Sequence, residues 1–221
     1  MNYAAIRKRV DEIAQQCGRH SQDISLVAVS KGYTGEAVWK VYEAGCRDFG
    51  ESRLVEGLPK REQSPHDIRW HLIGTLQKNK VRKAIGLFSL IHSVDSFELA
   101  QKLAQCSQEI SLSTSILLQV NVSGEKNKHG MQPEECLRAY EEICDLPGLQ
   151  VKGLMTIAPL TEEKEVIRQC FRGLRQLRDE LARRLGRGDV LHELSMGMSH
   201  DYPLAIQEGA TLLRIGTAIF S

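Results

Sequence analysis

The stretch ISLVAVSKGYTGEAVWKVYEAG, residues 24–45, contains one complete strand-and-helix unit. Its first part is apolar and partly β-branched as far as Lys31, which is typical of a buried strand. Its second part, residues 35–45, places apolar side chains on one side and stops at Gly45, which predicts a helix. A strand followed directly by a helix is the unit from which parallel sheets are built.

The same alternation continues to the end of the chain. Seven more runs predict strands: CRDFGE, IRWHLIG, SLIHSVD, ILLQVNV, QVKGLMTI, VLHELSMGM and LLRIGTAIF. The segments between them have helical periodicity; one begins at a capping box formed by Asp95 and Glu98, and Pro133 opens another. The longest predicted helix covers residues 161–186, with an acidic start and a basic end.

Eight strands, each followed by a helix, favour an α/β fold in which the sheet closes into a (β/α)8 TIM-like barrel. A further helix at residues 3–17 lies outside the repeat. No linker interrupts the pattern, so we expect a single domain over residues 1–221. An open doubly wound sheet is the alternative, but SKGYTGEA after the first strand lacks the GxGxxG turn that such sheets often carry.

The composition excludes several classes of protein. The chain has 29 Lys and Arg against 28 Asp and Glu, so no general charge attracts nucleic acid or an anionic membrane. No run approaches the roughly 18 apolar residues of a membrane span, and the N-terminus lacks a secretory apolar core. The six cysteines show no CxxC pair or metal-ligand spacing, and HELSMGMSH lacks the HExxH spacing, so we expect reduced thiols and no metal. These features predict a cytoplasmic protein that binds small molecules.

Lys31 is the first candidate functional residue, because it ends a buried strand. In a (β/α)8 barrel the chemistry gathers at the C-terminal ends of the strands. A lysine at this place either reaches solvent or serves as a nucleophile. In the second case we expect the barrel mouth to keep the amine desolvated.

The loops after the seventh and eighth strands, ELSMGMSHD and RIGTAI, favour a phosphate site. Ser195 and Thr217 can donate hydroxyl groups, while Gly197 and Gly216 allow an oxyanion to approach the backbone closely. A phosphate site together with Lys31 suggests a phosphorylated carbonyl compound held as a Schiff base.

Arg214, in the middle of the last predicted strand, carries a permanent charge toward the barrel mouth. Such a charge is costly unless something accepts its hydrogen bonds. One interpretation is a buried ion pair with Glu51 or Asp95. The other is a ligand contact, because the ring nitrogen of pyridoxal phosphate (PLP) is commonly paired with Asp or Arg.

Taken together, these motifs resemble the pyridoxal phosphate homeostasis protein family, small single-domain proteins similar to the N-terminal barrel of alanine racemase. The resemblance runs in order from about residue 24 to the C-terminus and includes LVAVSK, DFGE, WHLIGTLQKNK, VDS, VNVSGEKNKHG, GLMTIAP, ELSMGMSHDYPLAI and LLRIGTAIF. The combination of SMGMS and a following RIG is its most specific part.

The resemblance implies a role for each candidate residue. Lys31 forms the internal aldimine with PLP, and Arg214 hydrogen-bonds the pyridine nitrogen. Ser195, Gly216 and Thr217 hold the phosphate, and Met196 and Gly197 line the same pocket. The chain departs from the family at two places: Ser52 stands where FGEN is usual, and Thr75 stands where GHLQ is usual. These departures put a ring contact from either position in doubt.

As its function, the resemblance implies PLP binding in intracellular PLP homeostasis and, indirectly, in amino-acid balance, without robust catalysis. Arg214 can only donate to the ring nitrogen, which leaves the ring a poorer electron sink. The chain also ends at Ser221, directly after the last predicted strand, without the second domain that supplies the opposing tyrosine in alanine racemase. We therefore expect a monomer, with PLP-dependent apo-enzymes as candidate partners. A PLP-dependent amino-acid racemase and a Schiff-base barrel enzyme acting on a phosphorylated sugar are the alternatives.

Overall fold

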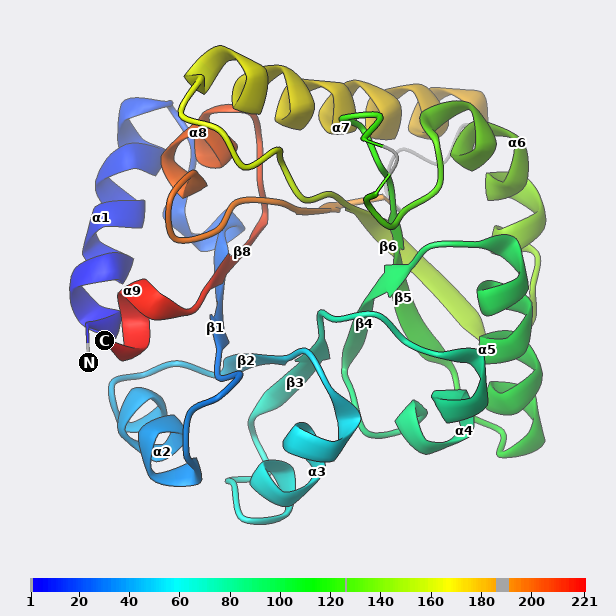
Figure 1. Ribbon diagram of the computed structural model, residues 1–221, viewed down its shortest axis with the longest axis horizontal. Helices are drawn as coiled ribbons and strands as arrows, with labels where there is room; N and C mark the ends of the chain where they lie inside the picture. Colours follow the sequence, from blue (N-terminus) through cyan, green and yellow to red (C-terminus); the bar gives the residue numbers. More distant parts are fainter. Residues whose placement is uncertain (1, 126, 186–190) are drawn as a thin grey trace.

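A computed structural model describes residues 2–125, 127–185 and 191–221 and shows a closed barrel of eight parallel strands (Figure 1). Each strand pairs with the next in chain order, and β8 pairs with β1 to close the sheet. The strands are β1 (Ser25–Val29), β2 (Asp48–Glu51), β3 (Arg69–Leu72), β4 (Leu90–Val94), β5 (Thr114–Gln119), β6 (Leu149–Met155), β7 (Glu193–Ser195) and β8 (Leu212–Ile215). The predicted (β/α)8 architecture is confirmed.

Helices surround the barrel on its outside (Figure 1). They are α1 (Tyr3–Gln16), α2 (Gly35–Glu43), α3 (Leu54–Glu62), α4 (Val81–Ala84), α5 (Phe97–Glu109), α6 (Pro133–Cys144), α7 (Lys164–Leu185), α8 (Tyr202–Gln207) and α9 (Thr217–Phe220). The additional N-terminal helix α1 packs against α8 and α9, and Asn2 N donates to Ile219 O at 2.7 Å, so the two ends of the chain lie together. None of the helices in the described ranges has the length and apolar character needed to cross a bilayer.

Two local predictions were wrong. The run LLRIGTAIF is not one strand, because the backbone of Gly216 (φ −105°, ψ −88°) leaves the extended conformation and Thr217 begins α9. The helix α5 is capped by Ser96 rather than Asp95. Ser96 has the extended backbone that an N-cap requires, and its hydroxyl accepts from Leu99 N at 3.3 Å.

The barrel separates two apolar cores. A large core fills the space between the strands and the helices, and a smaller cluster fills part of the barrel interior. The interior cluster consists of Val27, Leu90, Leu117, Met155 and Leu212. Strands β6 and β7 approach so closely that a Cβ at Gly153 would lie 1.9 Å from Glu193 O, so only glycine fits there.

Glu208, directly after α8, ties this helix to α7. Its buried carboxylate accepts hydrogen bonds from Arg168, Arg172 and Arg175 at 3.1 to 3.4 Å. Burial alone would raise the pKa of Glu208, but the three arginines outweigh it and hold that pKa below its ordinary value. The ion-pair cluster is therefore fully formed above the pKa of an unfolded glutamate, about 4.3.

We expect Glu208→Gln to lower the free energy of unfolding by about 2–3 kcal/mol at neutral pH, because charged hydrogen bonds are lost. The wild-type chain should lose this difference as the pH falls below about 4.3 and the carboxylate is protonated. Chemical denaturation at several pH values measures both effects. The matched control is Glu165→Gln, an exposed partner of Arg168, which should cost at most about 0.5 kcal/mol. Equal losses for the two variants would contradict the prediction.

Candidate functional site

Lys31 lies in the turn that follows β1, at the end of the barrel formed by the C-terminal ends of the strands, which we call the barrel mouth. The strand ends at Val29, and Gly32 adopts φ +77°, which lets the chain turn toward α2. Lys31 is exposed, and its amine has no hydrogen-bond or ion-pair partner among the described residues. The prediction that the first strand ends on Lys31 was therefore wrong, because β1 ends at Val29 and Lys31 belongs to the turn.

A buried polar cluster fixes the residue before Lys31. Ser30 Oγ donates to Glu51 Oε1 at 2.6 Å, and Lys60 Nζ donates to the same oxygen at 2.6 Å and to Ser30 O at 2.7 Å. Glu51 is completely buried, and its second oxygen, Oε2, has no hydrogen-bond partner among the described residues. Lys60 on α3 thus holds both the Glu51 carboxylate and the start of the turn that carries Lys31.

We expect Lys60→Met to lower the free energy of unfolding by about 3–5 kcal/mol, because it leaves the Glu51 charge buried without its cation. The double variant with Glu51→Leu should recover much of this loss, since it removes the stranded charge. Chemical denaturation measures the three stabilities, with the exposed Lys78→Met as a control. If Lys60→Met is as stable as the control, the contact of Lys60 with Glu51 does not stabilise the turn that carries Lys31.

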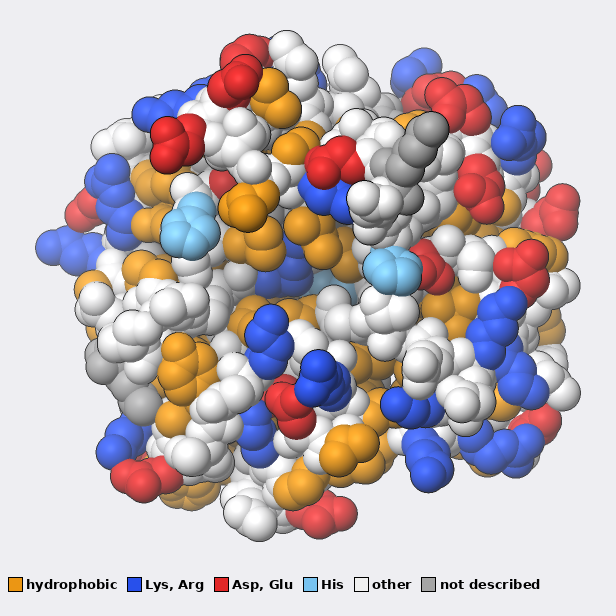
Figure 2. All heavy atoms as spheres, in the orientation of Figure 1, with side chains coloured by type: hydrophobic (Ala, Val, Ile, Leu, Met, Phe, Trp, Pro, Cys, Tyr) orange, Lys and Arg blue, Asp and Glu red, His pale blue; other side chains and the backbone are white. Residues whose placement is uncertain are grey.

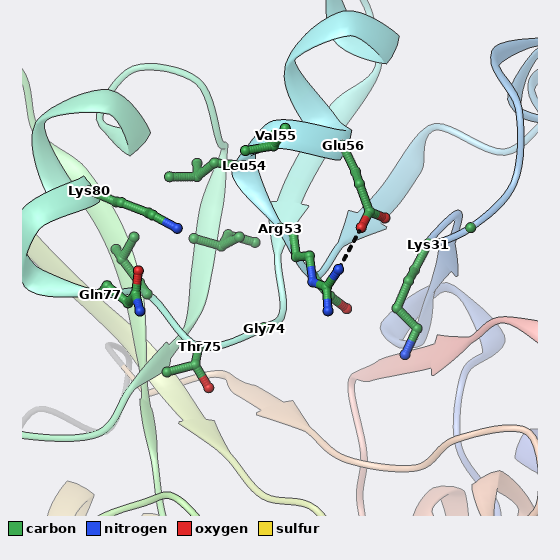
Figure 3. A pocket seen from close by; sticks show the side chains of 13 residues that line it. Lys31, Arg53, Leu54, Val55, Glu56, Gly74, Thr75, Gln77 and Lys80 are labelled. Carbon is green, nitrogen blue, oxygen red and sulfur yellow. Dashed lines mark hydrogen bonds and ion pairs between the residues drawn. The ribbon is translucent and has the colours of Figure 1, made fainter.

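A cavity of about 650 Å³ opens beside Lys31 (Figure 3). Its other walls come from the segments that follow β2 and β3, so it extends from Lys31 over one side of the mouth. Ser52 and Thr75, the two positions that depart from the family pattern, both line it. Arg53 also lines this cavity, with its guanidinium 3.4 Å from Glu56, as the dashed line in Figure 3 marks.

Arg214 reaches into the barrel from β8 and is 5% exposed. Its Nη1 donates to Ser195 Oγ at 2.6 Å, and its Nη2 donates to Thr156 O at 2.9 Å. Within the described ranges it forms no ion pair: Glu51 binds Lys60, and Asp95 lies 3.6 Å from His129. Burial lowers the pKa of Arg214 to about 10, against the opposing effect of Asp201, so the guanidinium stays charged at neutral pH.

The segment after β8 lies against the turn that bears Lys31. A Cβ at Gly216 would be 3.4 Å from Val29 O, which places this backbone beside the end of β1. Thr217 is exposed and begins α9, so the first N–H groups of that helix have no acceptor within it. The structure therefore brings Gly216 and Thr217 to the same part of the mouth as Lys31.

The residues after β7 differ in their exposure. Gly197 has φ +94°, and a Cβ there would lie 2.6 Å from Ala205 Cβ, so its backbone runs close to α8. Met196 is completely buried in the large core, and its side chain does not reach an open surface. Ser195 is also buried, but its hydroxyl contacts Arg214. Figure 2 shows basic side chains and histidine at the bottom of the central hollow on this face, between hydrophobic groups.

Two buried histidines in the barrel interior were missed in the sequence. His92 Nδ1 lies 2.8 Å from Ser195 Oγ, and His92 Nε2 lies 2.9 Å from His71 Nδ1. His71 Nε2 lies 3.1 Å from Asp48 Oδ1, and Asp48 accepts two hydrogen bonds of 2.6 Å from Arg69. The signal was present, since each histidine interrupts an apolar strand and the two strands are neighbours.

The sequence of this barrel is similar to that of a known class of protein. A family model described as "Alanine racemase, N-terminal domain" matches residues 1–221. Two relatives carry the name "Pyridoxal phosphate homeostasis protein". The protein from Aquifex aeolicus is 40% identical, over 97% of this chain and 94% of its own length. The protein from Pseudomonas aeruginosa is 42% identical, over 99% of this chain and 93% of its own length. The chain belongs to the pyridoxal phosphate homeostasis protein family.

A solved structure is similar over nearly the whole chain. It is described as PipY of Synechococcus elongatus with PLP bound. It is 36% identical, has a TM-score of 0.84, and covers 96% of this chain and 99% of its own.

Proposed function

We propose that this protein binds PLP and acts in intracellular PLP homeostasis and, through it, in amino-acid balance. The observation that carries the proposal is Arg214, a buried cation that no carboxylate neutralises among the described residues. Each of its terminal nitrogens uses one hydrogen in the bonds to Ser195 and Thr156 and keeps a second one. A pyridine nitrogen is an acceptor that fits this donor pair. The relative PipY, whose structure is described with PLP bound, supports the same ligand.

The other residues at the mouth fit the remaining groups of PLP. The unpartnered amine of Lys31 is available for Schiff-base attachment to the aldehyde. The phosphate would be held by Ser195, Gly216 and Thr217, with Gly197 completing the pocket. Met196 would contribute through packing, because its side chain is buried in the core.

The same arginine favours binding over catalysis. Bound PLP supplies an electron sink, and this sink is strongest when the ring nitrogen is protonated. Arg214 stays charged and can only donate to that nitrogen, so it gives the ring no proton. We therefore propose a carrier and not an enzyme: a single domain over residues 1–221, monomeric and cytoplasmic, that exchanges PLP with PLP-dependent apo-enzymes.

Absorbance spectroscopy tests the proposal. The purified protein, incubated with PLP and freed of excess, should show the visible band of lysine-bound PLP. Borohydride reduction and peptide mass analysis should then find the mass of reduced PLP on one peptide, which excludes a sugar adduct. Incubation of the loaded protein with amino acids should show no racemisation above free PLP. A colourless protein would overturn the binding proposal, and turnover of an amino acid would favour the racemase alternative.

A further inference from the structure

The chain of hydrogen bonds beneath Arg214 crosses the barrel interior, from β8 and β7 through β4 and β3 to β2. Each histidine nitrogen in it can donate or accept, depending on which tautomer is present. The groups at the two ends have no such choice: Arg214 can only donate, and an ionised Asp48 can only accept. The ends therefore limit which proton arrangements the chain can adopt.

Asp48 fixes one end of the chain as an acceptor. Burial alone would raise the pKa of Asp48, but hydrogen bonds and charge from His71 and Arg69 outweigh it and hold that pKa below its ordinary value. An ionised carboxylate must receive a hydrogen from the facing ring, so His71 Nε2 carries one. The remaining question is whether His71 Nδ1 also carries a hydrogen.

With neutral His71, every bond has one possible direction. His71 Nδ1 accepts from His92 Nε2–H, which leaves His92 Nδ1 as an acceptor. Ser195 then donates its hydroxyl hydrogen to His92 Nδ1, while its oxygen accepts from Arg214. In this state the Ser195 hydroxyl has no hydrogen to offer to a ligand at the mouth.

One added proton on His71 reverses the direction. A proton that arrives from the mouth at Ser195 Oγ displaces the hydroxyl hydrogen to His92 Nδ1, and the hydrogen on His92 Nε2 passes to His71 Nδ1. His71 Nδ1–H then donates to His92 Nε2, and His92 Nδ1–H donates to Ser195 Oγ. The Ser195 oxygen accepts from both His92 and Arg214, so its own hydrogen is free to point at the mouth. Three mobile hydrogens become four, and each transferred hydrogen moves only between the two atoms of one hydrogen bond. His92 stays neutral in both states, because burial, with His71 and Arg214 adding to it, holds its pKa well below the ordinary value.

We propose that His71 and His92 form a reversible relay in which proton uptake at His71 releases the Ser195 hydroxyl to bind a phosphate-bearing anion. His71 faces Asp48 of β2, Arg69 of its own strand and His92 of β4, and Arg214 of β8 faces the far side of His92. This inference rests on the proposed function, which places a phosphate at Ser195. Its consequence is that anion binding at the mouth and proton binding in the barrel interior strengthen each other.

Histidine tautomers in the free protein test the relay directly. Nitrogen-15 NMR of the imidazole rings should find His92 protonated at Nε2 at high pH. Acidification should shift the hydrogen of His92 from Nε2 to Nδ1 in step with protonation of His71. A His92 tautomer that stays at Nε2 when His71 becomes protonated would overturn the relay. This test uses the free protein and needs no ligand. It therefore decides whether the relay exists even if the proposed function is wrong.

Calorimetry tests the coupling to the ligand. The probe is 4′-deoxypyridoxine 5′-phosphate, which has no aldehyde and cannot react with Lys31. Binding in two buffers of different ionisation enthalpy gives the number of protons taken up, which in the wild type should exceed that of His71→Gln by up to about one. Glutamine keeps a donor for Asp48 and an acceptor for His92 but takes up no proton.

The exposed His66→Gln is the matched control and should behave as the wild type. The titrating phosphate of the probe contributes equally in all three proteins and cancels in the comparison. Equal proton uptake by the wild type and His71→Gln would overturn the coupling. Absence of binding in every protein would instead contradict the phosphate site of the proposed function.

Discussion

Lys31→Ala is expected to remove the visible absorbance of the PLP-loaded protein completely. Lys31 offers an exposed amine that has no hydrogen-bond or ion-pair partner among the described residues, and alanine removes this nucleophile. Because the side chain is exposed and makes no described contact, the free energy of unfolding should change by less than about 0.5 kcal/mol. The loss of the band should therefore occur in a fully folded protein, as thermal unfolding of the same sample can show.

Lys80→Ala is the matched control, since Lys80 is another exposed lysine of the same cavity. It should leave the visible band and the modified peptide unchanged. If the band survived in Lys31→Ala and disappeared in the control, the attachment site would be wrong while PLP binding itself would stand.

The fold was largely predictable because its signals are local and repeated. Each strand is a short apolar run, and each helix has its own period and boundary, so eight weak signals in a fixed order support one another. The errors came where two signals compete within one or two residues. Asp95 and Ser96 are both good N-caps, and only the backbone angles favour Ser96. The run through Gly216 is apolar throughout, so hydropathy alone does not reveal the change from strand to helix.

The site was only partly predictable, because its chemistry depends on contacts between distant strands. Arg214, Ser195 and Gly216 follow from their places at the barrel mouth. The partners of Arg214 do not, since Glu51 and Asp95 are equally plausible by spacing, whereas the structure assigns Ser195 and the carbonyl of Thr156.

The histidines illustrate the same limit. His71 and His92 lie one strand apart and 21 residues apart in sequence, and each alone looks like an ordinary buried polar residue. Their significance appears only when closure of the barrel brings Ser195, 103 residues beyond His92, into hydrogen-bond contact. A sequence gives the inward direction of each side chain by alternation, but not which inward side chains meet across the barrel.

Arg214→Leu is expected to weaken PLP binding by about 10- to 150-fold, which corresponds to the 1.5–3 kcal/mol of a charged hydrogen bond. Leucine is shorter and apolar, and it offers no donor to the ring nitrogen. Arg214→Lys should recover only part of the affinity, because an ammonium group cannot replace the planar fork that contacts Ser195 and Thr156. Dissociation constants from absorbance titrations measure these effects, with Arg184→Leu on the exposed part of α7 as the control.

Stability separates a binding role of Arg214 from a structural one. Its charge is buried and has no carboxylate partner in the part of the chain that the structure describes, so leucine removes a desolvation cost along with two hydrogen bonds. We therefore expect the free energy of unfolding of Arg214→Leu without PLP to stay within about 2 kcal/mol of the wild type. Full retention of PLP affinity in this variant would mean that another group meets the ring nitrogen. A large loss in the free energy of unfolding with unchanged PLP affinity would mean that Arg214 stabilises the barrel and does not bind the ligand.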